Sequence, residues 1–137
     1  MRILAIDHGD RRFGLAISDV TGMIARPLEV VEGEDFALRR VDEILDEDGV
    51  ERIVLGFPLD MDGGEGTKAQ VVKEFKKRLE ARVEIPVRLW DERLTTVQAE
   101  RILRDSGLST AKRRARVDMI AAQIILQSYL DSSRASS

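Results

Sequence analysis

The 137-residue chain contains no cysteine and a single histidine, His8. Without cysteine it can form neither a disulfide bond nor a thiolate metal site. One imidazole is also too few for a zinc site built on several histidines. Any metal ion must therefore be bound by oxygen ligands, which favours Mg²⁺ or Mn²⁺. Because a chain without cysteine suits a reducing compartment, we expect a cytoplasmic protein.

Aromatic residues make up only 4% of the chain, so stacking on aromatic rings cannot be the main means of binding a nucleic acid. No apolar run approaches the ~20 residues that cross a bilayer, and we expect no membrane association. The chain has 25 Asp and Glu residues and 22 Lys and Arg residues, which gives a net charge of -3. Nucleic-acid-binding domains commonly have a pI above ~9. The charge balance weakens the case for a nucleic-acid partner, but a local basic surface can accompany an acidic site.

The length fits one domain, residues 1–137, in which we expect the polar tail 131–137 to be disordered. Hydrophobic periodicity predicts strands that alternate with helices after an initial group of three strands. This order is typical of an α/β fold with a mixed central sheet and helices on both faces. The expected strands are 2–7, 13–18, 24–31, 52–56 and 87–90, and the expected helices are 36–47, 67–82, 95–107 and 114–130. Pro27 suits an edge position for the third strand.

Three acidic residues lie in apolar surroundings in distant parts of the sequence. Asp7 ends the first strand and Glu92 follows the last one, while Asp118 is the charged member of an apolar stripe on the final helix. The carboxyl ends of parallel strands share one edge of a sheet, so Asp7 and Glu92 should open on the same side if their strands are parallel. Asp91 is the alternative to Glu92, because adjacent strand residues point to opposite faces. Buried carboxylates need cations nearby, and three converging ones suggest a metal-dependent enzyme.

Basic residues near these acids are candidates for contacts with substrate phosphates, which give salt-sensitive affinity without reading sequence. The candidates are Arg11, Arg12, Lys68, Arg93, Lys112, Arg113, Arg114 and Arg116. The run before Asp118 could equally be a solvated surface, and Asp118 itself could cap its helix or pair with a nearby arginine. The glycine-rich segment 56–66 could bind a phosphate through backbone N–H groups or form a plain strand-to-helix turn.

Four motifs in this order resemble the YqgF family, also called RuvX. They are Ala5–Gly9 with Arg12–Asp19, Gly56–Gly63, Asp91–Thr96, and Val117–Ala122 with Ile125–Leu130. The resemblance spans nearly the whole chain. The sequence departs from the family pattern at Asp10, Phe13, Asp60 and Gly64, and none of these replaces a presumed catalytic acid. Asp10 adds negative charge near the expected site.

The resemblance implies a ribonuclease-H-like three-layer fold in which Asp7, Glu92 and Asp118 form the acidic cluster. Such a cluster can hold two divalent ions ~3.5–4 Å apart for in-line phosphodiester hydrolysis. The implied activity is a metal-dependent nuclease that processes the 5′ end of precursor 16S rRNA in ribosome biogenesis, with structured RNA and a pre-ribosomal particle as partners.

Three alternatives remain open at this stage. The first is a Holliday junction resolvase acting on branched DNA, which normally requires a two-fold dimer. No sequence feature indicates such a dimer, so the expected oligomeric state is a monomer or a weak dimer. The second is a non-catalytic RNA-binding factor in ribosome assembly. The third is an actin-like or sugar-kinase ATPase whose phosphate loop begins at Asp7, although 137 residues leave no room for the second domain that these proteins need.

Overall fold

The structure, a computed structural model, describes residues 1–93, 95, 104–105, 107 and 109–135, without the side chains of residues 110–111, 113–116, 118 and 134–135. Its strands form one sheet in the order β3-β2-β1-β4-β5. The strands are β1 (Arg2–His8), β2 (Arg12–Ser18), β3 (Ala25–Glu32), β4 (Val50–Phe57) and β5 (Val87–Asp91). β2 pairs antiparallel with β1 and β3, while β4 pairs parallel with β1 and β5. The predicted mixed α/β sheet is therefore confirmed, as is the edge position of the strand that carries Pro27.

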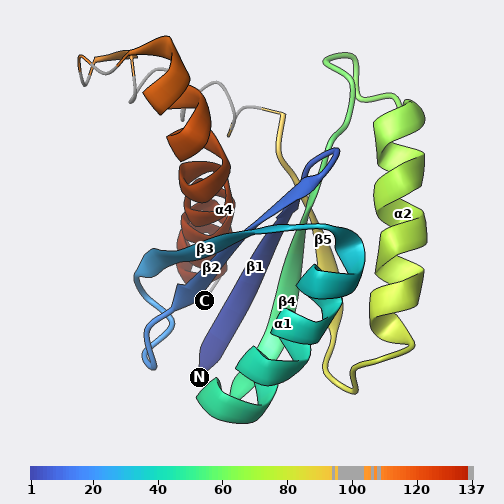
Figure 1. Cartoon of the computed structure of the whole chain (residues 1–137). Coiled ribbons are helices and arrows are strands. Elements are labelled where there is room, and N and C mark those ends of the chain that lie inside the picture. Colours follow the sequence, from blue (N-terminus) through green and yellow to red (C-terminus); the bar gives the residue numbers. More distant parts are fainter. Residues whose placement is uncertain (94, 96–103, 106, 108, 136–137) are drawn as a thin grey trace.

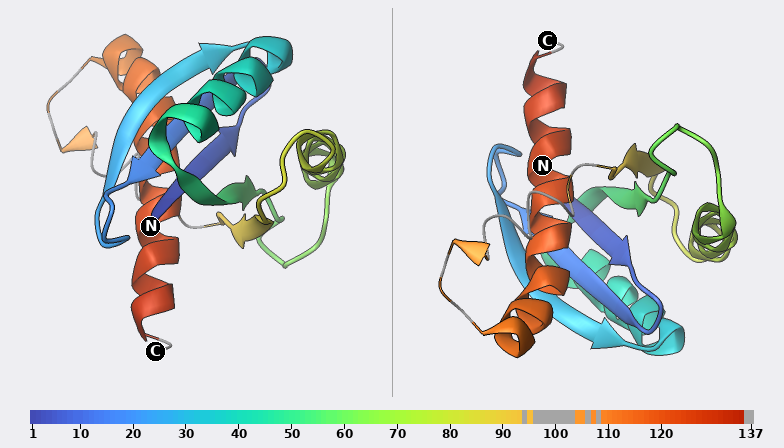
Figure 2. Two further views of the ribbon diagram at one scale, coloured as in Figure 1. Left: turned by 90° about the horizontal axis from the view of Figure 1, so that it is seen from below. Right: turned by 90° about the horizontal axis from the view of Figure 1, so that it is seen from above.

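Helices cover both faces of the sheet, in three layers (Figure 1). On one face lie α1 (Glu34–Asp48) and α2 (Thr67–Glu80), and on the other lies α4 (Thr110–Ala135). Figure 2 shows α4 crossing the face of the sheet that lies opposite α1. The larger core lies under α1 and α2, where apolar residues of both helices pack on alternate strand residues such as Leu4 and Ile6. The smaller core joins α4 to the opposite face, where Ala5 and Ala122 allow close approach.

The last helix is longer at both ends than the sequence pattern predicts. It begins at Thr110 and continues to Ala135, so residues 131–135 of the polar segment 131–137 are helical. Nothing in this segment breaks a helix, since it contains neither proline nor glycine. The helix expected at 95–107 falls almost entirely outside the described residues. Among the helices that the structure describes, none is long and apolar enough to span a membrane.

The two ends of the sheet differ in construction. At the amino end of β1, the turn between β2 and β3 is braced by Asp19. Its carboxylate accepts hydrogen bonds from the Thr21 hydroxyl and from the backbone N–H groups of Met23 and Ile24, at 2.9 and 3.0 Å for the two backbone groups. At the other end, the parallel strands β1, β4 and β5 all terminate at one edge. That edge carries the acidic residues singled out in the sequence.

Candidate active site

Two carboxyl groups meet where β1 and β5 end. Asp7 is the penultimate residue of β1 and follows Ile3 and Ala5 in the alternation that faces α4. Glu92 comes directly after β5, and its carboxyl group is hydrogen-bonded to that of Asp7. Burial, together with the charge of Asp7, raises the pKa of Glu92 to about 8. In the absence of a cation, this environment therefore favours the protonated form of Glu92, which can donate a hydrogen bond to Asp7.

A glycine in the strand between them makes room for this pair. Gly56 lies in β4, beside Trp90 of β5. A Cβ atom at position 56 would collide with the Glu92 carboxylate and would stand 2.8 Å from Cδ1 of Ile125 in α4. Any larger residue at this position would therefore push the Glu92 side chain away. The sequence predicts Gly56 as the last residue of the strand 52–56 and the first of the glycine-rich segment, but it does not predict this function, which depends on the register of β4 and not on local composition.

Asp91 and Glu92 lie in different surroundings. The Asp91 carboxylate is held by Arg93, whose Nε donates a hydrogen bond at 2.9 Å and whose Nη2 lies at 2.7 Å. These hydrogen bonds lower the pKa of Asp91. Glu92, and not Asp91, lies beside Asp7. The register that the sequence left undecided is thus resolved in favour of Glu92 as the partner of Asp7, while the role of either residue in metal binding stays a prediction.

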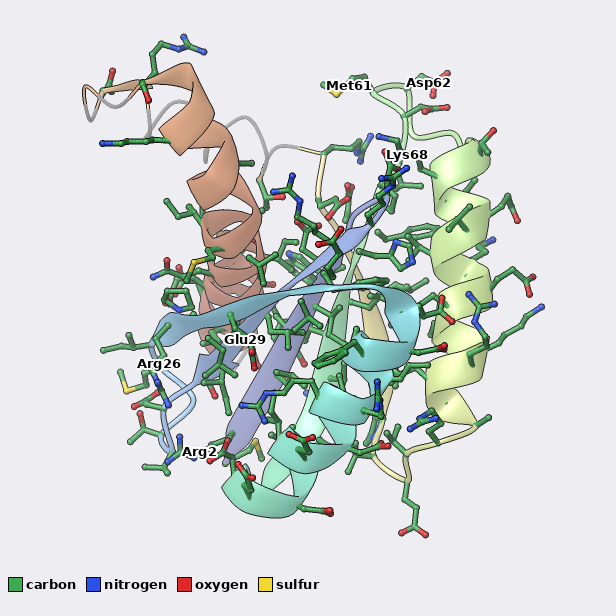
Figure 3. The ribbon with its side chains drawn as sticks, in the orientation of Figure 1. Arg2, Arg26, Glu29, Met61, Asp62 and Lys68 are labelled. Atoms are coloured by element: carbon green, nitrogen blue, oxygen red, sulfur yellow. The ribbon has the colours of Figure 1, made fainter. Side chains whose placement is uncertain are left out.

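An open cleft of about 690 Å³ lies above the carboxyl pair. Its walls are the β1–β2 turn, the start of the loop after β4, and the first turns of α2. The described lining residues are Asp7, His8, Gly9, Asp10, Pro58, Leu59, Thr67, Lys68, Val71, Val72, Glu92 and Arg93. Lys68 is exposed at the top of α2 (Figure 3), and its positive charge acts on the Glu92 carboxyl group. The cleft thus combines two half-buried acids with an exposed lysine.

Aromatic side chains support the cleft beneath His8. The His8 ring contacts Phe13 and Phe75 edge-on, with centroids 4.7 and 4.9 Å apart. Burial lowers the pKa of His8, so the imidazole is neutral at pH 7. Phe13, one of the departures from the family pattern, therefore has a packing role beside the cleft.

The other basic candidates lie in different places. Arg11 lines a shallower adjoining pocket together with Asp10. Arg12 is exposed at the start of β2, and Lys112 is exposed in α4. The side chains of Arg113, Arg114 and Arg116 lie outside the described residues. Among the candidates whose side chains are described, Lys68 and Arg93 line the cleft itself.

The donors in the cleft suit a hard divalent cation. Both acids offer carboxylate oxygens, the ligands that Mg²⁺ and Mn²⁺ prefer. A cation between them would also compensate the repulsion that holds Glu92 protonated. Among the side chains described, no three carboxylate or imidazole groups lie close enough together to bind one ion. The third predicted acid, Asp118, has its backbone in α4, and its side chain is not among those described.

Comparison with known proteins places the chain in one family. A family described as "RuvX: Holliday junction resolvase" matches residues 1–132. A Chloroflexus aurantiacus protein named "Putative pre-16S rRNA nuclease" is 46% identical over 134 residues, 96% of this chain and 88% of that protein. A Geobacillus protein of the same name is 44% identical over 138 residues, 98% of this chain and all of that protein.

Solved structures share the fold. RuvC of T. thermophilus, solved with a Holliday junction substrate, has a TM-score of 0.61 at 19% identity and covers 99% of this chain and 98% of its own. The fowlpox virus resolvase, solved with Holliday junction DNA, has a TM-score of 0.58 at 16% identity and covers 97% of this chain and 99% of its own. The predicted ribonuclease-H-like architecture is therefore confirmed. The match over residues 1–132 and the relatives at 44% and 46% identity show that the chain belongs to the RuvX family.

Proposed function

We propose that this protein is a cytoplasmic nuclease that depends on Mg²⁺ or Mn²⁺ and hydrolyses phosphodiester bonds at the 5′ end of precursor 16S rRNA. The observation that carries the proposal is the pair of hydrogen-bonded carboxyl groups, Asp7 and Glu92, that line an open cleft together with Lys68. Relatives that match along nearly their whole length bear the name of this activity, which supports the choice of substrate.

The carboxylates would hold the ions. When bound, two divalent ions supply an activated water molecule and neutralise the charge that develops on the phosphate oxygens. Asp7 and Glu92, which both line the cleft, would hold the ions together with Asp118. All three carboxyl groups would bind the ions in their ionised form.

Basic side chains would bind and orient the nucleic acid. Lys68 lines the cleft together with the carboxyl pair and would hold a phosphate adjacent to the bond that is cut. Arg11 and Arg12 would extend this contact along the β1–β2 turn. The run that comprises Lys112, Arg113, Arg114 and Arg116 would extend it along the start of α4. Such contacts orient the strand without reading its sequence.

Branched DNA is the second candidate substrate. The matching family is described as a Holliday junction resolvase, and the RuvC structure that shares this fold was solved with such a junction. Symmetric cleavage of a four-way junction requires two active sites related by a two-fold axis. A monomer or weak dimer would therefore favour RNA as the substrate.

The decisive experiment compares two substrates and two variants. Purified protein is incubated with a precursor 16S rRNA fragment and with a four-way DNA junction, each with Mn²⁺ or with EDTA. We expect cleavage of the RNA with Mn²⁺, none with EDTA, and none by Asp7→Asn. Asp46→Asn is the matched control, because it removes the same charge from the exposed surface of α1.

The outcomes separate the candidate functions. Cleavage that persists in EDTA or in Asp7→Asn contradicts the metal mechanism. Cleavage of the junction alone would assign the protein to DNA. Tight RNA binding without cleavage under every condition would instead favour a non-catalytic assembly factor.

A further inference from the structure

In the cleft, the guanidinium of Arg93 is paired with the carboxylate of Asp91. Its Nε donates to Oδ2 of Asp91 at 2.9 Å, its Nη2 lies 2.7 Å from the same oxygen, and its backbone N–H donates to Oδ1 at 3.0 Å. The interaction raises the pKa of Arg93 and lowers that of Asp91. A paired guanidinium has little net charge left to attract a phosphate, so this contact is a poor candidate for substrate binding.

Glu92 lies between the two members of this pair, and its backbone is held on both sides. Its N–H donates to the carbonyl of Phe57 at the end of β4, at 3.2 Å. Its own carbonyl accepts from the backbone N–H of Thr95 at 3.1 Å and from the Thr95 hydroxyl at 2.9 Å. The Thr95 side chain is buried. The peptide that carries Glu92 is thus tied to the neighbouring strand and to the turn that follows it.

Arg93 also reaches the loop 58–66, whose first residues line the cleft. Its Nη1 lies 3.6 Å from the place that a Cβ of Gly63 would occupy, and Gly63 has a φ of +90°, which favours glycine. The Gly63 N–H donates to the Asp60 carbonyl at 2.8 Å, which folds the loop on itself. The charge of Asp62, at the top of the same loop in Figure 3, also raises the pKa of Arg93. The Arg93 side chain, which is paired with Asp91 at the end of β5, therefore lies beside this loop.

We propose that the Asp91–Arg93 pair is a positioning device. It holds the Glu92 carboxyl group against Asp7 and fixes the loop 58–66 as a wall of the cleft, and it does not bind a substrate phosphate. The inference rests on the proposed function, because it takes Glu92 to be a metal ligand. Partners of this kind, one step removed from the ion, commonly change metal affinity by ~10–100-fold when they are lost.

Binding of Mn²⁺ to the substrate-free protein tests the inference. The variants are Asp91→Asn, Arg93→Ala, Arg93→Lys and the double variant Asp91→Asn/Arg93→Ala, with affinity measured by calorimetry. We expect each single variant to bind Mn²⁺ about 10-fold more weakly or worse, and the double variant to lose no more than the singles. Arg93→Lys should also weaken Mn²⁺ binding, because an ammonium group cannot reproduce the contacts that Nε and Nη2 of the guanidinium make together with Asp91. Lys77→Ala is the control, since it removes an exposed ion pair with Glu74 on α2.

Steady-state cleavage separates positioning from phosphate binding. If Arg93 positions Glu92, its variants lower kcat at fixed Mn²⁺, excess Mn²⁺ restores part of the rate, and the salt dependence of KM is unchanged. Unchanged Mn²⁺ affinity, together with a raised KM and a shallower salt dependence, would overturn the inference and assign Arg93 to the substrate.

Failure of the inference is distinguishable from failure of the proposed function. The proposed function fails if the wild-type protein does not bind Mn²⁺ or if Asp7→Asn binds it equally well. Amide hydrogen exchange, which needs no metal, then decides on positioning. Faster exchange at Glu92 and Gly63 in Arg93→Ala supports the device, and unchanged exchange at both amides overturns it.

Discussion

Replacement of Glu92 by glutamine should make the metal-free protein more stable at alkaline pH. The folded protein raises the pKa of Glu92 from 4.5 to about 8, so folding favours the protonated form. A group with a raised pKa contributes its full stability below the unfolded value and loses it as pH rises through the folded value. Wild-type stability should therefore decline between about pH 4.5 and pH 8, while a glutamine does not titrate.

The magnitude follows from the size of the shift. At about 1.36 kcal/mol for each pKa unit, a shift from 4.5 to about 8 corresponds to roughly 5 kcal/mol as an upper limit. Because the cleft is open to solvent, which screens part of the repulsion, we expect Glu92→Gln to gain about 2 kcal/mol over the wild type above pH 8.

Urea unfolding followed by circular dichroism measures the effect, at about pH 5 and about pH 9 and in EDTA. The Glu47→Gln variant, which removes the same charge from the exposed surface of α1, is the control. Adding Mg²⁺ at the higher pH should stabilise the wild type and leave Glu92→Gln nearly unchanged, because a ligand stabilises only the state that binds it. Equal pH dependence in the wild type and in Glu92→Gln would refute the reasoning.

Three further substitutions test other parts of the structure. Gly56→Ala should cost about 1–3 kcal/mol in urea unfolding and weaken Mn²⁺ binding, because the new methyl group occupies the space of the Glu92 carboxylate; wild-type stability and Mn²⁺ affinity would contradict this. Lys68→Ala should raise KM and flatten its salt dependence while kcat changes less, whereas Lys77→Ala, on the same helix, should leave all three unchanged; equal effects of the two variants would exclude a specific contact. Asp19→Ala should lower the thermal midpoint without altering Mn²⁺ affinity, because it removes three hydrogen bonds from a turn at the opposite end of the sheet; a parallel loss of Mn²⁺ affinity would show that the two ends are coupled.

Much of the fold follows from local pattern. Short apolar runs alternating with amphipathic segments predicted the strands and the helices α1 and α2 to within a few residues, because each element has one buried face and a clear period. The shared edge for Asp7 and Glu92 followed from their places at the ends of two strands. The extent of α4 did not follow, since polar residues such as Asp131 and Ser132 leave no periodic signal although they continue a helix.

Details of the site depend on contacts between distant segments. The choice between Asp91 and Glu92 turns on a single step in strand register, which reverses the face of every side chain. The engagement of Arg93 by Asp91 could not be predicted either, because a sequence shows that a basic residue is near but not what it binds. Gly56 is a third case, since the space it leaves is filled by Glu92, which follows β5.

The position of β5 at the edge of the sheet has a consequence for how this protein loses activity. Glu92, one member of the carboxyl pair, follows the five-residue strand β5, which is hydrogen-bonded within the sheet only to β4. Edge strands detach at lower free energy than the central strands that carry Asp7. Mild denaturant or heat should therefore abolish catalysis while the circular dichroism signal is still that of the folded chain. The rate of turnover would then report on the pairing of β5 with β4.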